Sequence, residues 1–489
     1  MKKSSLTTAV LAGLAGLVGF AGSAGAVDLN PDGTGQVLIY PYYTVQAGQQ
    51  TYVSVVNSTD VAKAVKVRFI ESYNSREVLD FNLFLSPYDV WTGTIFALSD
   101  AGLTGDGAAF GTSDNSCTVP SFANLSTSVG NLHYQPFSNS EFSGAKSDGG
   151  PTDVSRTREG YVELIQMADI ADNNGTATAV THVQPAGVPA GCGSSLLRDT
   201  GNTDFVAPTG GLFGAGQIID VANGTLYSYN ADAIQGFSIT PLFRDSGSLD
   251  PNLSAANTDL AGNATANVFQ GTGVVSATYP PASAIDAVSA VFDASSLMNE
   301  WISNASGGQG TDWVVTFPTK RFYVDPQTNP AAPVQPFPEA FVDGTACTQV
   351  EVGTGHMFNR EELTTTTTTN DDFSPRPPGI PPKSLCYEVN VISFSDASNA
   401  VSVLGAANPL NLNTAGFATA GWLKLGLNPV AETHQMRTST NGITFFGLPA
   451  TGFSAQRYIN ANAQPGTLAN YAGAFRHRVE RDISAVQVP

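Results

Sequence analysis

Strict alternation decides the fold class in residues 65–69, VKVRF, where apolar side chains alternate with Lys66 and Arg68. A period of two places the two kinds of side chain on opposite faces of a β-strand. The same alternation recurs in residues 79–85, LDFNLFL. Such a pattern is typical of antiparallel strands with one buried and one solvated face.

Further strands surround this stretch. Residues 37–43 and 52–56 are rich in Val, Ile and Tyr, and short sequences rich in Asn, Ser and Asp separate the strands, as turns require. Residues 30–96 are therefore predicted to form one β-sandwich unit. Later strands are predicted at residues 160–165, 216–229, 313–317, 386–392, 421–427 and 443–446. The fold class is mainly β: antiparallel β-sandwiches with long loops.

One segment departs from the strand pattern. Ser283 follows two prolines and precedes Asp286 by three residues, which is close to a capping box. Apolar residues then recur at roughly helical spacing as far as Trp301. We predict one amphipathic helix near residues 283–302, which serves as a structural lid on a sheet and ends before Gly307.

The first 26 residues have the organisation of a signal peptide. Lys2 and Lys3 precede an apolar run over residues 9–20, and the small residues at 24–26 form a cleavage signature. We predict export through the Sec pathway of a Gram-negative bacterium, with a mature chain that begins at Val27. The predicted location is extracellular or on the cell surface.

Composition narrows the choice of partners. Only 13% of the 489 residues are charged, and 41 acidic residues outnumber 22 basic ones, which gives a net charge of −19. Nucleic acids and anionic lipids are poor partners for so acidic a chain. After the signal segment, no apolar run reaches the about 18 residues that a membrane helix needs. Membrane insertion is therefore not expected.

The four cysteines are Cys117, Cys192, Cys347 and Cys386, and they allow three pairings in an oxidising compartment. We favour Cys117 with Cys192 and Cys347 with Cys386, because each bond then closes a polar loop rich in Gly and Pro. The alternative is zinc, but zinc sites use ligands that lie close in sequence, and these cysteines are far apart.

Domain organisation follows from composition. After the signal peptide (1–26) we expect an immunoglobulin-like sandwich at 27–103, a Gly/Ser/Asn-rich loop region at 104–155, and a larger β-rich region at 156–489. The last region contains a Thr/Pro-rich loop at 361–382, whose prolines cannot donate to a sheet ladder. This loop is equally consistent with a binding loop and with a spacer.

No familiar catalytic motif is present in the sequence, which contains neither G-x-S-x-G nor G-x4-G-K-[ST]. The candidates for sugar chemistry are Glu159 and Glu163, near Tyr161, and Asp312, beside Trp313. Each carboxylate adjoins an aromatic ring that could stack on a sugar. The alternative, which we favour, is that these are outward-facing residues at strand ends.

Two sets of residues are candidates for assembly. Lys320 and Arg321 could contact an acidic neighbour, although the simpler interpretation is that they form the polar end of a strand. The strand at 37–43 could pair with the exposed sheet edge of another copy, in which case deletion of residues 27–45 would abolish assembly and leave the monomer folded. Its candidate contact residues are Val37, Ile39, Tyr40, Tyr42 and Tyr43.

A resemblance to known proteins rests on three stretches: residues 52–59 (YVSVVNST), 65–69 (VKVRF) and 85–91 (LSPYDVW). Together they resemble the strand-turn-strand openings of immunoglobulin-like bacterial surface domains, and an uncharacterised group of exported proteobacterial cell-surface proteins. The resemblance covers about 70 residues and describes a fold more than a function. It implies a surface scaffold without catalytic residues.

The leading hypothesis is a secreted, acidic, non-catalytic protein of a surface layer, filament or adhesion, which assembles with itself or with other surface proteins. The alternative is a secreted carbohydrate-binding or carbohydrate-active protein. No cofactor is predicted. Oxygen ligands for calcium are abundant, but the sequence locates no calcium site.

Overall fold

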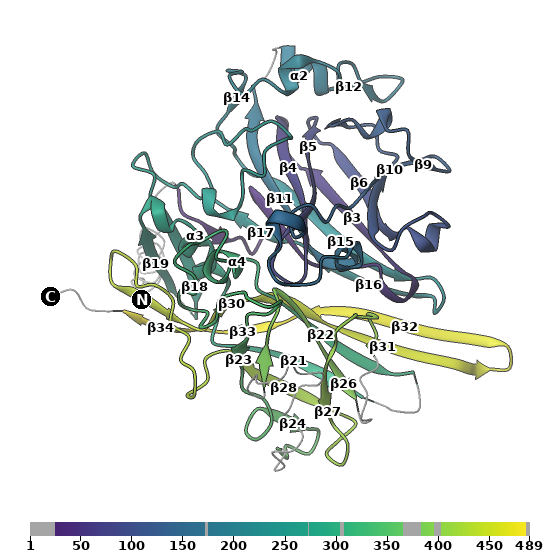
Figure 1. Ribbon diagram of the computed structural model, residues 1–489, viewed down its shortest axis with the longest axis vertical. Coiled ribbons are helices and arrows are strands. Elements are labelled where there is room, and N and C mark those ends of the chain that lie inside the picture. Colours follow the sequence, from purple (N-terminus) through teal and green to yellow (C-terminus); the bar gives the residue numbers. More distant parts are fainter. Residues whose placement is uncertain are drawn as a thin grey trace, which may run out of the picture.

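Two β-sandwiches account for most of the chain, and in Figure 1 they lie one above the other. The computed structural model describes residues 25–171, 175–271, 273–303, 308–364, 383–395 and 402–485. The first sandwich uses residues from the amino-terminal half, coloured purple to teal, and the second uses the green and yellow carboxy-terminal part. The predicted mainly-β class is confirmed.

The first sandwich has two antiparallel sheets. One sheet has the order β1-β17-β2-β11-β4-β5-β8, with β14 also paired to β11. Its strands are β1 (Asp28–Leu29), β2 (Val37–Thr44), β4 (Ala62–Glu71), β5 (Glu77–Leu85), β8 (Cys117–Val119), β11 (Glu159–Ile170), β14 (Phe205–Val206) and β17 (Asp232–Gln235). The other sheet has the order β16-β15-β3-β6-β7-β10-β9. Its strands are β3 (Gln49–Asn57), β6 (Val90–Ala97), β7 (Ala108–Thr112), β9 (Ser128–Val129), β10 (Leu132–Pro136), β15 (Leu212–Asp220) and β16 (Thr225–Asn230).

Aromatic rings fill the space between these two sheets. Phe69 and Phe81 project from β4 and β5, and they meet Trp91 and Phe110 from β6 and β7. The ring centroids of Phe69 and Phe110 are 4.8 Å apart, and those of Phe81 and Trp91 are 5.8 Å apart. The apolar positions of the alternating stretches therefore face one common core, as the pattern predicts.

The polar positions of β4 correct one expectation, because they do not face water. All ten residues of β4 are buried. Lys66 pairs with Asp80 and donates to the carbonyl of Ser248 at 2.6 Å, while Nε of Arg68 pairs with Glu77 at 2.6 Å. The alternation separates an apolar face from a polar one, and later chain segments cover the polar face.

The second sandwich also consists of two sheets. A five-stranded sheet has the order β27-β26-β22-β31-β32, and a four-stranded sheet has the order β24-β28-β21-β33. The strands are β21 (Ser296–Ile302), β22 (Gly310–Thr316), β24 (Met357–Asn359), β26 (Val389–Ser395), β27 (Leu410–Asn413), β28 (Ala420–Gly426), β31 (Thr451–Gln464), β32 (Thr467–Arg476) and β33 (Arg478–Glu480). Trp301 and Phe394 stack between the sheets, with ring centroids 5.6 Å apart. The hairpin β31–β32 passes beside the first sandwich and projects from the body (Figure 1).

Smaller elements complete the described chain. The two-stranded pairs are β12 (His182–Val183) with β13 (Val188–Pro189), β18 (Ala264–Gln270) with β19 (Gly273–Tyr279), β20 (Asp293–Ala294) with β30 (Leu448–Pro449), β23 (Thr348–Gln349) with β25 (Ser384–Leu385), and β29 (Ile443–Phe446) with β34 (Asp482–Ala485). The α-helices are α2 (Gly175–Val180), α3 (Ile285–Phe292) and α4 (Arg321–Val324).

The predicted helix at 283–302 is correct only in its first half. Helix α3 ends at Phe292, and β21 then pairs with β28 over seven residues. Leu297 and Trp301 are fully buried and four residues apart, a spacing that fits one face of a helix and one face of a strand equally well. Ser283 does not cap α3; its hydroxyl accepts a hydrogen bond from Arg437 at 2.7 Å.

Two predicted boundaries also change. The first sandwich extends past residue 103 as far as β17, and the predicted loop region at 104–155 contributes β7, β8, β9 and β10 to its sheets. The predicted strand at 216–229 is a hairpin, β15–β16, with its turn at 221–224. The sequence pattern did not predict these short strands because each has only two to five residues, too few to show a clear period of two.

Both disulfides form with the predicted partners, Cys117 with Cys192 and Cys347 with Cys386. The first bond ties β8, at the edge of the first sheet, to the segment after α2. The second joins the chain on either side of the β23–β25 pair. The predicted signal sequence, through residue 24, and most of the Thr/Pro-rich loop, residues 365–382, lie outside the described residues.

Candidate functional site

The two carboxylates on β11 lie inside the protein. Glu163 pairs with Nη1 of Arg68, and Glu159 accepts hydrogen bonds from the Tyr42 hydroxyl at 2.9 Å and from the Ala407 amide at 3.2 Å. Burial raises the pKa of both carboxyls, to about 7 for Glu159. Neither reading of these residues is correct: they are not outward strand-end residues, and no sugar can reach them.

Asp312 is also buried. Its carboxylate accepts hydrogen bonds from the hydroxyls of Ser393 and Ser402, each at 2.6 Å. The ring of Trp313 is fully buried, and that of Tyr161 is 1% exposed. Both rings belong to the protein core, so neither offers a stacking surface for a sugar. The strands that carry them are covered on both faces, which alternation alone does not reveal.

The strand predicted to mediate assembly, β2, lies in the interior of the first sheet. It pairs with β17 on one side and β11 on the other. Val37, Ile39, Tyr40, Tyr42 and Tyr43 are all fully buried. The prediction that this strand reaches a neighbour's sheet edge is therefore wrong for the folded chain. Deletion of residues 27–45 would remove a central strand and unfold the sandwich.

The two candidate cations at 320 and 321 make internal contacts. The Lys320 amine is buried and donates to the carbonyl oxygens of Ala346, at 2.6 Å, and Tyr387, at 3.2 Å. Burial lowers the pKa of Lys320 to about 8. Arg321 donates to the carbonyl of Ser75 in the first sandwich at 3.0 Å. Lys320 and Arg321 thus form hydrogen bonds with other parts of the same chain, so the predicted contact with an acidic partner is wrong.

A buried network of ion pairs continues from this point. Arg76 pairs with Asp325 at 2.9 Å, and Arg156 pairs with Glu71 at 2.8 Å and with Asp148 at 2.7 Å. The Arg76–Asp325 pair joins the first sandwich to the chain after α4. Buried pairs of this kind depend on precise geometry, because each charge has lost its water. The network fixes how the two parts of the molecule sit together.

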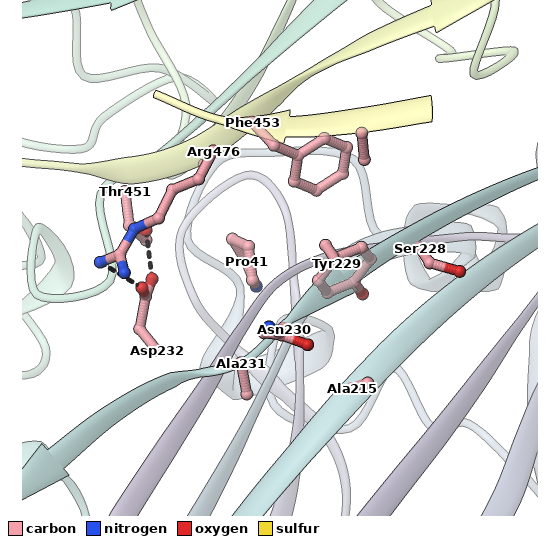
Figure 2. A pocket seen from close by; sticks show the side chains of 12 residues that line it. Pro41, Ala215, Ser228, Tyr229, Asn230, Ala231, Asp232, Thr451, Phe453 and Arg476 are labelled. Carbon is pink, nitrogen blue, oxygen red and sulfur yellow. Dashed lines mark hydrogen bonds and ion pairs between the residues drawn. The ribbon is translucent and has the colours of Figure 1, made fainter. Parts of the chain in front are cut away.

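A pocket of about 280 Å³ lies between the first sandwich and the β31–β32 hairpin (Figure 2). Its walls come from β15, β16 and β17 on one side and from β31 and β32 on the other. Asp232 and Arg476 form an ion pair at 2.5 Å across it, and the Thr451 hydroxyl also donates to Asp232. The rings of Tyr229 and Phe453 stack nearby with centroids 4.8 Å apart.

The charged groups of this pocket interact with one another. Burial raises the pKa of the Asp232 carboxyl, while Arg476 and the Thr451 hydroxyl act in the opposite direction. The carboxylate and the guanidinium are therefore occupied mainly with one another. The residues described along its walls include no His, Cys or Lys that could act as a base or nucleophile. Its residues are up to about 435 positions apart in sequence, too far for any local pattern to predict.

A second surface feature, which we call the uncharged face, is the outward side of β16, β15, β3 and β6. Its largest side chains are well exposed: Tyr52 at 42%, Phe213 at 41%, Leu226 at 44% and Val90 at 52%. The remaining outward positions carry Gln50, Ser54, Val56, Thr92, Ala215, Gln217, Ile219, Ser228 and Asn230. None of these side chains is an Asp, Glu, Lys, Arg or His.

The register arranges the uncharged face in rows across the sheet. Tyr52 lies opposite Gln217 on β15, and Gln217 lies opposite Ser228 on β16. Val56 lies between Phe213 and Val90 in another row. The face is thus a continuous surface on four hydrogen-bonded strands. Its signal in the sequence is the set of uncharged residues that alternate with the core positions.

The described residues form neither a metal site nor a membrane-spanning helix. Within the described residues, no three His, Cys, Asp or Glu side chains group in a way that could hold a metal ion. No helix in that part of the chain has the length and apolar character to cross a bilayer. Comparison of the chain with protein-family models, curated proteins and solved structures gives no match. The resemblance to immunoglobulin-like surface domains stays a prediction.

Proposed function

We propose that the protein is an exported, non-catalytic structural protein of the cell surface or exterior, and that copies of it associate through the uncharged face. The observation that carries the proposal is the exposure of this face. It presents aromatic and aliphatic side chains, and no acidic or basic residue, on four adjacent strands. Exposed apolar surface of this kind is characteristic of interaction sites.

Charge favours a second copy as the partner. A chain with a net charge of −19 repels its own copies over most of its surface. Contact through a face without acidic or basic residues brings no like charges together and leaves no charge buried without a partner. The face therefore offers a route to self-association with a small electrostatic cost.

Export is supported by separate features. Two disulfides are typical of oxidising compartments outside the cytosol. The first residues have the basic, apolar and small-residue segments of a Sec signal peptide. Both features fit a location outside the cytosol.

The carbohydrate-active alternative loses the residues on which it was built. Glu163 pairs with Arg68 in the interior, and Trp313 is fully buried. A sugar would have to bind elsewhere on the molecule, so the structural role is the better supported of the two.

The test is light scattering after size-exclusion chromatography of the mature, oxidised protein over a series of concentrations, with negative-stain electron microscopy of the fractions. We expect the mass to rise with concentration. The double variant Tyr52→Glu/Phe213→Glu should remain monomeric, because the added carboxylates repel across the contact. Leu260→Glu is the control, since Leu260 is 97% exposed and lies outside the face.

A wild-type protein that stays monomeric at every concentration would overturn the proposal. So would association that the double variant and the Leu260→Glu control weaken equally, because the effect would then come from net charge alone.

A further inference from the structure

Arg476 also lines a second pocket, which is larger than the first, with a volume of about 590 Å³. Its walls come from β1, β17 and β18, and from the segment that leads from β32 into β33. That segment has the sequence RHRVER at 476–481, and its three arginines all line the pocket. We call this set, Arg476, Arg478 and Arg481, the arginine cluster.

Few carboxylates of the protein neutralise the positive charge of the arginine cluster. The pocket lining includes no Asp or Glu, although the chain has 41 acidic residues against 22 basic ones. Arg476 pairs with Asp232, but the described structure gives Arg478 and Arg481 no ion pair. Arg478 is exposed and donates only to the carbonyl of Arg476, at 3.2 Å. Arg481 makes two long bonds, of 3.4 Å each, to backbone carbonyls.

No carboxylate of the described residues lines the pocket. Asp293 is buried and interacts with Arg481; burial raises the pKa of this carboxyl well above its usual range, while Arg481 acts in the opposite direction. Burial lowers the pKa of Arg481, attraction to Asp293 raises it, and repulsion from Arg476 lowers it. His477 is buried, its Nε2 donates to the carbonyl of Val314 at 3.0 Å, and burial lowers its pKa to about 4. The described lining of the pocket therefore carries three guanidinium groups and no carboxylate.

The other walls suit a ligand larger than an inorganic anion. Phe269 is 49% exposed at the pocket and offers a ring surface. The side-chain oxygen of Asn267 accepts from Ser276 at 2.6 Å, which leaves its amide nitrogen to donate to a ligand. Aromatic surface, a free amide donor and guanidinium groups are together the usual means of binding an acidic sugar.

We propose that this pocket binds an anionic sugar, that is, a sugar with a carboxylate, sulfate or phosphate group. The anionic group lies between Arg478 and Arg481, whose planar guanidinium groups match the geometry of such oxyanions. The sugar ring lies against Phe269, and its hydroxyls accept from Asn267. This site is separate from the uncharged face, so the inference does not depend on self-association.

Isothermal titration calorimetry of the mature protein tests the proposal, with galacturonic acid, glucose 6-sulfate and glucose 6-phosphate as probes. Glucose and inorganic phosphate separate the contribution of the ring from that of the charge. We expect saturable binding of at least one acidic sugar, at least about tenfold tighter than either control and weaker at high salt.

Variants locate the site. Arg478→Gln should weaken binding of the acidic sugar about ten- to hundredfold, the usual effect of losing one charge-assisted contact. Arg244→Gln is the matched control, because Arg244 is also exposed and also donates only to a backbone carbonyl, at 2.9 Å. Phe269→Ala should weaken the acidic sugar and leave phosphate binding unchanged.

Three results would overturn the proposal: no saturable binding of any acidic sugar, equal affinity for inorganic phosphate, or equal losses in Arg478→Gln and Arg244→Gln. Both arginines are exposed, so the variants should keep the wild-type unfolding temperature. That temperature is to be measured alongside.

Discussion

Replacement of Glu159 by Gln should change how the stability of the protein depends on pH. Glu159 lies on β11, is 8% exposed, and accepts hydrogen bonds from Tyr42 and Ala407. Burial is the largest influence on this carboxyl and raises its pKa from 4.5 to about 7, while the two hydrogen bonds oppose the shift. The folded protein therefore holds this proton over a pH range in which the unfolded chain has released it.

The sign and size of the effect follow from linkage. A carboxyl with a raised pKa in the folded state gives its full stabilising contribution below pH 4.5, and the contribution disappears as the pH rises through about 7. At about 1.4 kcal/mol per pKa unit, the shift corresponds to about 3 kcal/mol. Gln has nearly the same shape, accepts the same two hydrogen bonds and does not titrate.

Calorimetric unfolding of wild type and Glu159→Gln between pH 4.5 and 8.5 measures this effect. We expect the variant to be equal to or less stable than wild type at pH 4.5, and more stable by about 3 kcal/mol at pH 8.5. Glu361→Gln is the control, because Glu361 is an exposed glutamate, and its difference from wild type should not vary in this way. A constant difference between Glu159→Gln and wild type over the whole range would refute the reasoning.

Two further substitutions test the packing and the cross-links. Gly160→Ala should destabilise the protein by about 2 to 3 kcal/mol, because a Cβ at this position would collide with the carbonyl oxygen of Ile70. The control in the same thermal scan is Gly193→Ala, because a Cβ there meets no atom within 4 Å. Equal effects of the two substitutions would contradict the prediction. Replacing Cys347 and Cys386 together by Ser should cost about 4 kcal/mol in urea unfolding, because the bond closes a loop with a sequence separation of 39. An unchanged stability would show that removal of this disulfide gives the unfolded chain little additional conformational freedom.

Alternation in the sequence identified strands correctly but not their exposure. The stretch at 65–69 is a strand with Val67 facing the core, as predicted, yet Lys66 on its other face is buried as well. A period of two reports that the two faces differ in polarity. Whether the polar face meets water or another part of the chain depends on segments about 180 residues away, such as the one that contains Ser248.

The first pocket and the arginine cluster depend on tertiary structure more than the strands do. Asp232 and Arg476 meet because β17 of the first sandwich lies beside the β31–β32 hairpin of the second, and neither residue has a local signature. The arginine cluster had a local signal, RHRVER at 476–481, but the large acidic excess of the whole chain concealed it. Charge counted over short windows would have found it, whereas the net charge could not.

The central position of β2 has a consequence for biosynthesis. This apolar strand, VLIYPYYT, has both its sheet partners later in the chain, and β11 begins 115 residues after Thr44. At about 5 to 20 residues per second, the nascent chain waits roughly 6 to 23 s before the first partner exists. During that interval the segment is an apolar stretch without a strand partner, in which Pro41 opposes pairing with another chain. The segment that the sequence suggested for assembly of the folded protein is thus the segment that most needs to be shielded from other chains during synthesis.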